Sequence, residues 1–399
     1  MKKGLLSLAV LGLAAGSLCG ITSCDSTSGI DGVKVGFIFL HDETSSYDKN
    51  FIDAAKSTVA ALGLSSSQVI YKTGIAENDG DYDAAADLVD QGCNVIFADS
   101  FGHESAMLKA AKEFPNVQFC HATGTQAHTA NVANYHNTFA DIYQGRYLTG
   151  IVAGMKINEM IAAGTITADE AVMGYVGAYP YAEVVSGYTS FYLGAKSVCD
   201  SVTMSVRYTN SWYDVTAEQS TANALIKTDH AVIISQHADS QGAPSACEAA
   251  GVPNVFYNGT NLDKDTYLVA SRINWVPYFT YMLESVRDNV TMPSDYCGTI
   301  ANGAVEVLTL NDELAAEGTA AAIETATTAL KNKTIHVFDT SKFTVDGAAK
   351  TSYLADVDDD GTYVGETEVI SGGYFHESEY RSAPYFDLRI DGITEKTSN

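Results

Sequence analysis

Aromatic and polar residues occur together in several short clusters of the sequence, each directly after an apolar segment. The clusters lie at residues 42–51, 99–102, 210–214, 236–240 and 274–279. Aromatic rings offer stacking faces, and carboxylates, amides and imidazoles pair with the donors and acceptors on a ring edge. Side chains of these two kinds suit a flat heteroaromatic ligand, so the clusters predict a binding site for such a molecule.

Twelve residues in or near these clusters are candidates for contact with that ligand. They are Asp42, Phe51, Asp99, Ser100, Phe101, Tyr179, Trp212, His237, Asp239, Asn258, Asn274 and Trp275. A second interpretation stays open for several of them. Phe51 and the two tryptophans of the chain could pack within a lobe, Asp42 could be a turn residue, and His237 could satisfy the backbone at a strand end.

The sequence carries none of the common catalytic motifs. It lacks the phosphate loop G-x-x-x-x-G-K-[ST], the zinc-protease motif H-E-x-x-H and the nucleophile motif G-x-S-x-G. The pairs His103-Glu104 and His376-Glu377 have no second histidine at the required spacing. We therefore expect a binding protein without cofactor and not an enzyme.

The elements around the clusters predict an α/β fold. Apolar β-branched segments alternate with segments of helical periodicity over residues 33–122, and a second such series covers residues 172–236. Alternation of this kind indicates βαβ units and parallel sheets. We predict two doubly wound lobes joined by a multi-stranded hinge, with the ligand beyond the carboxyl ends of the strands.

The lobe boundaries follow from the same pattern. Residues 33–140 form lobe 1, to which residues of about 271–300 return, and residues 141–270 with parts of 301–399 form lobe 2. The segment 267–273 reads as a strand that leads back to the first lobe. The last hundred residues are less regular, with strands expected at 303–308 and 334–338 and a helix at 312–331.

The N-terminus has the features of an exported protein. Lys2 and Lys3 precede an apolar stretch over residues 5–18, and small residues stand directly before Cys24. Residues 1–23 thus read as a signal peptide whose end resembles the lipobox of bacterial lipoproteins, with Cys24 as the lipidated residue. Residues 24–32 are short and polar, as in a flexible tether.

Composition narrows the range of partners. A net charge of −26 argues against nucleic acid, and the 46% of hydrophobic residues allows sizeable cores. Five cysteines outside the leader, at positions 93, 120, 199, 247 and 297, show no metal-like spacing, and we interpret most of them as buried apolar residues.

Several segments resemble the basic-membrane-protein family of ABC-transporter lipoproteins, which bind purine nucleosides with a periplasmic-binding-protein type I fold. The segments are Asp48-Lys49-Asn50-Phe51, Asn137-Thr138-Phe139-Ala140-Asp141, Tyr147-Leu148-Thr149-Gly150 and Gly174-Tyr175-Val176-Gly177. The resemblance implies that Asp42 and Phe51 help to form the pocket, with Phe51 stacked on the base. It runs from Val33 to about Asn289.

Three further segments resemble family members associated with purines, including free adenine. They are 211–214, 236–240 and 274–278, which contain Trp212, His237 and Trp275. Relatives that bind nucleosides hold the ribose with an Asp and a Lys, and neither aligns here. Arg272 could compensate, but the missing pair favours a free base over a nucleoside. A sugar ligand and a surface receptor that senses purines are the alternatives.

The resemblance also implies partners. We expect a small purine ligand, an ABC permease with its ATPase, and a membrane reached through the lipid anchor, with the protein itself a monomer facing outside the cytoplasm.

An acidic segment with Asp356, Asp358 and Asp360 copies the start of a calcium loop, but Thr367 stands where the loop needs Glu. We interpret it as a solvated turn and predict no metal site, with a weak surface ion site as the alternative.

The anchor is testable. Because small residues precede Cys24, we expect Cys24→Ala to release or mislocalise the protein while ligand binding persists. Fractionation of cells with a salt wash of the membranes measures this. A variant that stays on the washed membranes contradicts the lipobox interpretation.

Overall fold

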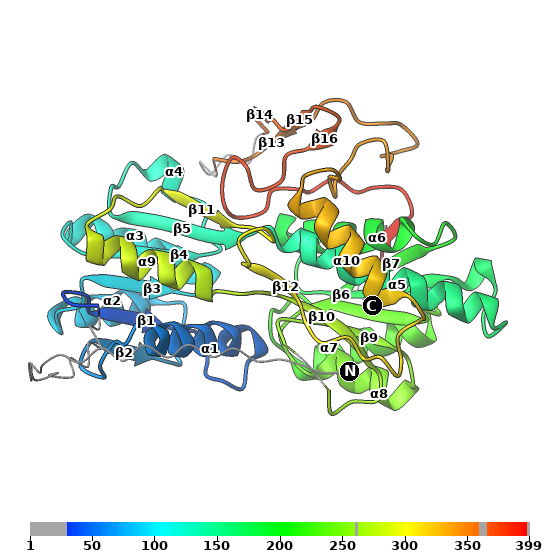
Figure 1. Cartoon of the computed structure of the whole chain (residues 1–399), viewed down its shortest axis with the longest axis horizontal. Coiled ribbons are helices and arrows are strands. Elements are labelled where there is room, and N and C mark those ends of the chain that lie inside the picture. Colours follow the sequence, from blue (N-terminus) through cyan, green and yellow to red (C-terminus); the bar gives the residue numbers. More distant parts are fainter. Residues whose placement is uncertain (1–29, 260–261, 359–364, 397–399) are drawn as a thin grey trace, which may run out of the picture.

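The computed structural model describes residues 30–259, 262–358 and 365–396. Two α/β lobes lie side by side, each built on its own sheet, and the end of the chain crosses above both of them (Figure 1). This confirms the predicted fold class. The predicted signal peptide, the tether and Cys24 lie outside the described residues.

The first lobe contains a six-stranded parallel sheet in the order β11-β5-β4-β3-β1-β2. Its strands are β1 (Val35–Ile38), β2 (Val69–Lys72), β3 (Val95–Ala98), β4 (Gln118–Ala122), β5 (Tyr135–Ala140) and β11 (Asp295–Gly298). Its helices are α1 (Ser46–Ala61), α2 (Asp79–Asp90), α3 (Glu104–Glu113), the short α4 (Ala127–Ala130) and α9 (Val276–Asp288), with a 3₁₀ turn at Phe101–His103.

Side-chain alternation along β1 explains why this sheet is covered on both faces. Phe37 packs on α9, with its ring 5.2 Å from that of Phe279, whereas Gly36 faces Leu88 of α2. Successive side chains of a strand point to opposite faces. A strand that is buried on both faces reads as a continuous apolar run, and most of residues 33–40 are apolar.

The second lobe contains a seven-stranded sheet in the order β12-β10-β9-β8-β6-β7-β17. Its strands are β6 (Val172–Gly177), β7 (Thr203–Tyr208), β8 (Ile233–His237), β9 (Asn254–Tyr257), β10 (Tyr267–Ile273), β12 (Val305–Val307) and β17 (Ile393–Glu395). Its helices are α5 (Ile142–Ala162), α6 (Ala182–Lys196), α7 (Val215–Lys227), α8 (Gly242–Ala250) and α10 (Thr319–Lys331), with a 3₁₀ turn at Ala168–Glu170.

Strand β10 corrects one expectation about this lobe. The segment Tyr267–Ile273 pairs with β9 and β12 and so belongs to the second sheet, not to a return into the first lobe. The chain crosses to the first lobe only after it, through Asn274 and into α9. Apolar alternation identifies a strand but carries no information about which sheet takes it up.

Three crossings between the lobes lie side by side and form the hinge. They are the β5–α5 junction at Ala140–Asp141, the β10–α9 junction at Asn274, and the segment from β11 to β12. Backbone hydrogen bonds tie them together, from Asp141 N to Gly298 O (2.8 Å) and from Asn274 N to Ala304 O (2.8 Å). The side chain of Asn274 also donates to Gly303 O (3.1 Å). Asn274 is therefore a hinge residue.

Helices α5 and α6 cross at two glycines. A Cβ atom on Gly150 would stand 2.0 Å from Phe191 O, and one on Gly194 would stand 2.0 Å from Tyr147 O. Only glycine allows backbones to approach this closely. The motif Tyr147-Leu148-Thr149-Gly150 is thus explained by helix packing in the second lobe.

The last part of the chain departs from the sequence-based expectation. Residues 334–338 form turns rather than a strand, and the helix expected from residue 312 begins at Thr319, after Gly318 with φ +82°. Short strands follow as two pairs, β13 (Leu354–Ala355) with β14 (Thr367–Glu368) and β15 (Ile370–Ser371) with β16 (Tyr374–Phe375). Phe338 is nevertheless buried, with its ring 4.2 Å from that of Phe386, so its apolar neighbourhood serves packing and not a sheet.

Among the residues that the structure describes, we find no helix with the length and apolar character needed to cross a membrane.

Candidate ligand-binding site

A cavity lies between the two lobes at the carboxyl ends of both sheets. It is lined by Leu40, His41, Tyr47, Asp48, Glu77, Ser100, Phe101 and Thr123 of the first lobe and by Glu183, Trp212, Tyr213, His237, Asp239 and Tyr257 of the second. Its volume is about 70 Å³. By the same measure of volume, a cavity needs roughly 10–15 Å³ to hold one water molecule. The cavity therefore has room for a compact ligand.

Direct contacts between the lobes close the cavity along one edge. The hydroxyl of Ser46 at the start of α1 donates to Asp239 O after β8 (2.8 Å). The rings of His41 and Tyr213, also from opposite lobes, lie 5.7 Å apart. The structure thus shows the two lobes in contact around the site.

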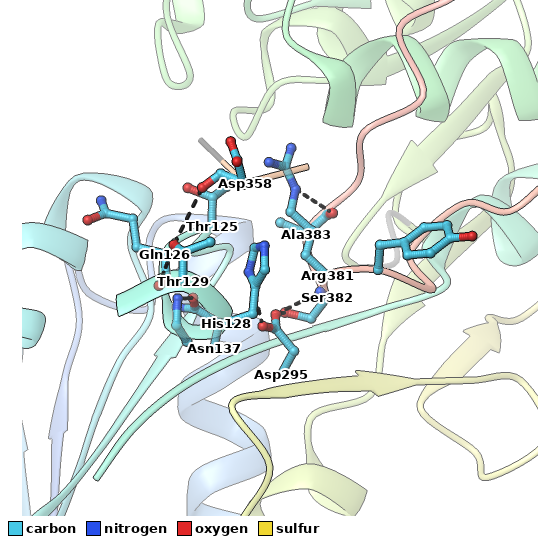
Figure 2. Close-up of polar contacts among 12 residues, drawn as sticks. Thr125, Gln126, His128, Thr129, Asn137, Asp295, Asp358, Arg381, Ser382 and Ala383 are labelled. Carbon is cyan, nitrogen blue, oxygen red and sulfur yellow. Dashed lines mark hydrogen bonds and ion pairs between the residues drawn. The ribbon is translucent and has the colours of Figure 1, made fainter. Parts of the chain in front are cut away.

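An outer chamber of about 530 Å³ adjoins the cavity. Phe101, Thr123, Glu183 and Trp212 border both spaces. The outer chamber is also lined by Arg381 and Ala383 of the last part of the chain, which Figure 2 shows beside residues of the first lobe. A ligand larger than the inner cavity therefore has space on this side.

Five of the twelve candidate residues line the cavity, namely Ser100, Phe101, Trp212, His237 and Asp239. Asp99 lies directly behind its wall. Its buried carboxylate accepts from Leu40 N (3.1 Å), and its carbonyl accepts from the hydroxyl of Tyr47 (2.7 Å). Asp99 thereby holds two residues that do line the cavity.

The structure does not bring Asp42, Phe51 or Trp275 to the cavity. Asp42 is exposed and accepts from the backbone of Thr44 (2.9 Å), as a turn residue does. Phe51 is 1% exposed and stacks on Trp275 at 4.3 Å between ring centres. Both rings belong to the core of the first lobe, because α1 and α9 pack together there.

Tyr179 and Asn258 stand one layer away from the cavity. Tyr179 lies behind Trp212, with 5.7 Å between the rings. Asn258 is buried at the end of β9 with φ 59°, and its backbone N–H donates to Ser271 O (3.0 Å).

The acidic segment near the end of the chain lies away from the cavity. The carboxylate oxygens of Asp356, Asp358 and Glu366 lie within 4.8 Å of one another, and Asp360 lies outside the described residues.

Asp48 lines the cavity, although it is not among the twelve candidate residues. The N-cap of α1 is Ser45, whose hydroxyl accepts from Asp48 N, so Asp48 stands in the first turn of the helix and not at its cap. Its carboxylate accepts from His41 N (2.7 Å) and lies 3.1 Å from the ring nitrogen Nδ1 of His41. The spacing Ser-x-x-Asp is itself a helix-start signal and could have revealed this.

Carboxylates dominate the electrostatics of the site. Asp48 and Glu77 come from the first lobe, and Glu183 and Asp239 from the second. Burial raises the pKa of Asp239 well above its ordinary value, and the nearby Glu218, Asp48 and Glu183 raise it further. Burial and the adjacent Asp48 likewise raise the pKa of Asp99. Such a site disfavours an anionic ligand and favours one that donates hydrogen bonds.

One buried cation partly balances these acids. Arg146 of α5 is fully buried, donates to Gln236 O (2.9 Å) and lies 3.6 Å above the ring of Tyr257. It fixes the ring that forms the back of the cavity. His237 beside it lies 3.2 Å from Glu183, and burial lowers the pKa of His237, which favours its neutral form.

Residues 38–283 match the model of the family Bmp, described as ABC transporter substrate-binding protein PnrA-like. The chain belongs to this family. It is 32% identical over 284 residues to a purine-binding protein of Brucella abortus, covering 69% of this chain and 75% of that protein. The resemblance seen in the sequence is thereby confirmed.

The chain is also similar to a second transporter protein in sequence and to solved solute-binding proteins in structure. The chain is 31% identical over 212 residues to a putative ABC transporter glucose-binding protein of Haloferax volcanii, covering 53% of this chain and 50% of that protein. A solved solute-binding protein of an ABC transporter system from Aeropyrum pernix K1 superposes with a TM-score of 0.65 at 13% identity, covering 77% of this chain and 93% of that one. The fold is thus that of the type I periplasmic binding proteins.

Family membership fixes the general role. The protein is the extracytoplasmic substrate-binding component of an ABC transporter and not an enzyme. Its partners are a small-molecule substrate and the permease with its ATPase.

The acids behind the cavity make stability depend on pH. Burial holds the pKa of Asp99 in the folded protein above its ordinary value of 3.8, so the folded state keeps a proton that the unfolded chain releases. The free energy of unfolding therefore falls as the pH rises from the ordinary pKa of Asp99 towards its raised pKa in the folded protein. Asp99→Asn keeps the acceptor for Leu40 N and removes the titration. We expect its Tm to exceed that of the wild type by about 2 °C or more at pH 8 and the gain to vanish towards pH 4.

Asp42→Asn is the matched control for this measurement. Hydrogen bonds from Thr44 lower the pKa of the exposed Asp42, so its substitution gives no gain at pH 8. Equal behaviour of the two variants in thermal unfolding from pH 4 to 8 would contradict the raised pKa of Asp99.

Proposed function

We propose that the protein delivers a purine base, adenine-like in its donor groups, or a purine nucleoside to an ABC importer. The observation that carries this proposal is the pairing of aromatic faces and carboxylates around one small interlobe cavity. Tyr47 and Phe101 supply faces from the first lobe, and Trp212 and Tyr257 from the second. The similarity to a purine-binding protein supports the same ligand class.

The aromatic rings can stack on the faces of a purine base, and the carboxylates can accept hydrogen bonds from its edge. Base–aromatic stacking contributes about 1–3 kcal/mol, and here rings from opposite lobes can contact both faces of one base. Ring N–H groups and an exocyclic amine donate to carboxylates such as Asp239 and Asp48. A phosphate would face four carboxylates, so nucleotides are excluded from the proposal.

Within this proposal we favour a free base over a nucleoside. The candidate for a ribose-binding cation, Arg272, is paired with Glu306 in the hinge (2.8 Å). The inner cavity itself is small. A ribose would have to extend into the outer chamber, past Phe101 and Trp212.

A sugar is the second candidate ligand. The similarity to a putative glucose-binding protein favours it, and aromatic faces with carboxylate acceptors also suit the hydroxyl groups of a sugar. A purine-sensing surface receptor would use the same cavity. We further propose that lipid attachment at Cys24 holds the protein on the outer side of the cell membrane.

The stacking role of Trp212 can be measured directly. We expect Trp212→Ala to weaken adenine binding about tenfold or more, as read by calorimetry, without loss of folding. Tyr380→Ala, an exposed tyrosine of the last segment, is the control and leaves affinity unchanged. Phe51→Ala should instead lower stability by about 3–5 kcal/mol, because Phe51 is a core residue. An unchanged adenine affinity in Trp212→Ala would remove this residue from the site.

A ligand panel tests the donor preference. We expect adenine to bind at least as tightly as adenosine, and AMP and glucose not to bind. Asp239→Ala should weaken adenine about tenfold or more, because an N–H donor is then left unpaired, and should affect caffeine, which has no N–H group, much less. Adenosine binding a hundredfold tighter than adenine would move the assignment to nucleosides, and glucose binding alone would move it to sugars.

A further inference from the structure

A second, larger cavity lies at the hinge. Its volume is about 380 Å³, and it shares no lining residue with the interlobe cavity. Two of the three lobe crossings border it, through Asp141 at the start of α5 and Cys297 in β11. The remaining walls come from residues 330–338 and 374–379. We call this space the hinge pocket.

Part of the wall of the hinge pocket is aromatic, and the remaining lining residues are polar, charged or aliphatic. The ring of Tyr143 at the start of α5 lies 5.2 Å from that of Phe338, and Phe338 in turn lies 6.3 Å from Phe375. Tyr374 stacks on His336 at 3.6 Å nearer the rim. These faces suit a ligand with a flat or apolar body.

The floor of the hinge pocket holds a carboxylate with spare bonding capacity. Glu377 is 2% exposed. One of its oxygens accepts from Tyr385 N (3.3 Å), whereas the other, Oε1, has no hydrogen-bond partner within the described part of the chain. A buried polar atom without a partner is destabilising, and more so when it is charged. The hydroxyl of Ser186 and the charge of Arg381 also act on this carboxyl group and lower its pKa, but Oε1 itself accepts no hydrogen bond within the described residues.

A second acid shares this floor. Asp141 accepts from the thiol of Cys297 (3.2 Å). Burial raises the pKa of Asp141 to about 7 and that of Glu377 to about 8, and each acid raises the pKa of Cys297 further above its ordinary value. A thiol held in its protonated form does not supply the thiolate that binds a soft metal ion, so the chemistry of the floor points to an organic donor.

The wall that carries Glu377 is fixed in place. The backbone N–H and the hydroxyl of Ser382 both donate to Asp295 of β11, at 2.8 and 2.7 Å, as Figure 2 shows. Further along, β17 pairs with β7 of the second lobe. Because this segment is bound to both lobes, Glu377 is held over the hinge and is not part of a loose tail.

We propose that the hinge pocket binds a second small molecule, an organic cation with a flat or apolar body that donates N–H groups to Glu377 and Asp141. The pairing of a buried carboxylate oxygen that lacks a donor with aromatic rings in the wall defines this class. The exposed Lys331 and Lys333 also line the hinge pocket, and the charge of Lys333 lowers the pKa of Asp141 against the larger effect of burial. The proposal does not depend on the identity of the ligand in the interlobe cavity.

Benzamidine, a flat cation with two N–H₂ groups, is the probe. We expect it to bind the full-length protein at least tenfold more tightly than its anionic and neutral analogues benzoate and benzamide, measured by calorimetry and saturation-transfer NMR. Benzamidine binding no tighter than that of benzoate would overturn the proposal.

Three variants assign the bound probe to one cavity. Glu377→Gln, which keeps the shape of the side chain, should weaken benzamidine at least tenfold. Ala301→Trp, at an exposed turn that lines the hinge pocket, should block it without a change in the core. Asp239→Ala should leave it unchanged. Loss of benzamidine in Asp239→Ala with retention in Glu377→Gln would assign the probe to the interlobe cavity and overturn the hinge site.

Adenine binding, measured on the same samples, separates this test from that of the proposed function. Glu377→Gln and Ala301→Trp should keep the wild-type affinity for adenine and a cooperative thermal transition. Benzamidine binding without adenine binding supports the hinge site and contradicts the purine assignment, and the reverse result does the opposite.

Discussion

The hinge is the constraint on which both cavities depend. Two parallel sheets can turn their carboxyl ends toward one ligand only if the chain passes between them near those ends, and the structure makes this passage three times in adjacent positions. Bonds from Asp141 N to Gly298 O and from Asn274 N to Ala304 O tie these passages together. Because the crossings are short and bonded to one another, they allow rotation of the lobes about the hinge better than translation.

The acids around the interlobe cavity repel one another, and this repulsion dominates the electrostatics of the site. Asp48 and Asp239 approach from opposite lobes, and Asp99 stands behind Asp48. Like charges at close range in a buried site cannot all ionise at low cost. A ligand rich in N–H donors relieves this repulsion when the lobes close, whereas an anion increases it.

Much of the fold could be predicted because its signals are local. The strand at residues 33–40 and the polar clusters after the strands can be recognised from patterns of a few residues. Ligands bind beyond the carboxyl ends of parallel strands, and this rule led us to choose Trp212 and Asp239, which both line the cavity. Other positions depend on tertiary contacts. Phe51 and Trp275 have the residue types of a stacking site, yet they stack on each other because α1 and α9 pack together. No sequence pattern distinguishes these two outcomes for an aromatic residue on a helix.

Two buried acids outside the interlobe cavity differ in their hydrogen bonding. Glu104, 5% exposed at the start of α3, receives hydrogen bonds from Thr125 N (2.8 Å), Gln126 N (2.9 Å) and the hydroxyl of Tyr135 (3.2 Å). Its bonding is complete, so it fixes the loop after β4 and offers nothing to a ligand. Glu377 is about as buried, lines the hinge pocket, and has one oxygen to which no described residue donates. It lies beyond residue 283, where the match to the family ends. The part of the chain beyond the family match thus supplies one wall of the hinge pocket, including the buried acid Glu377.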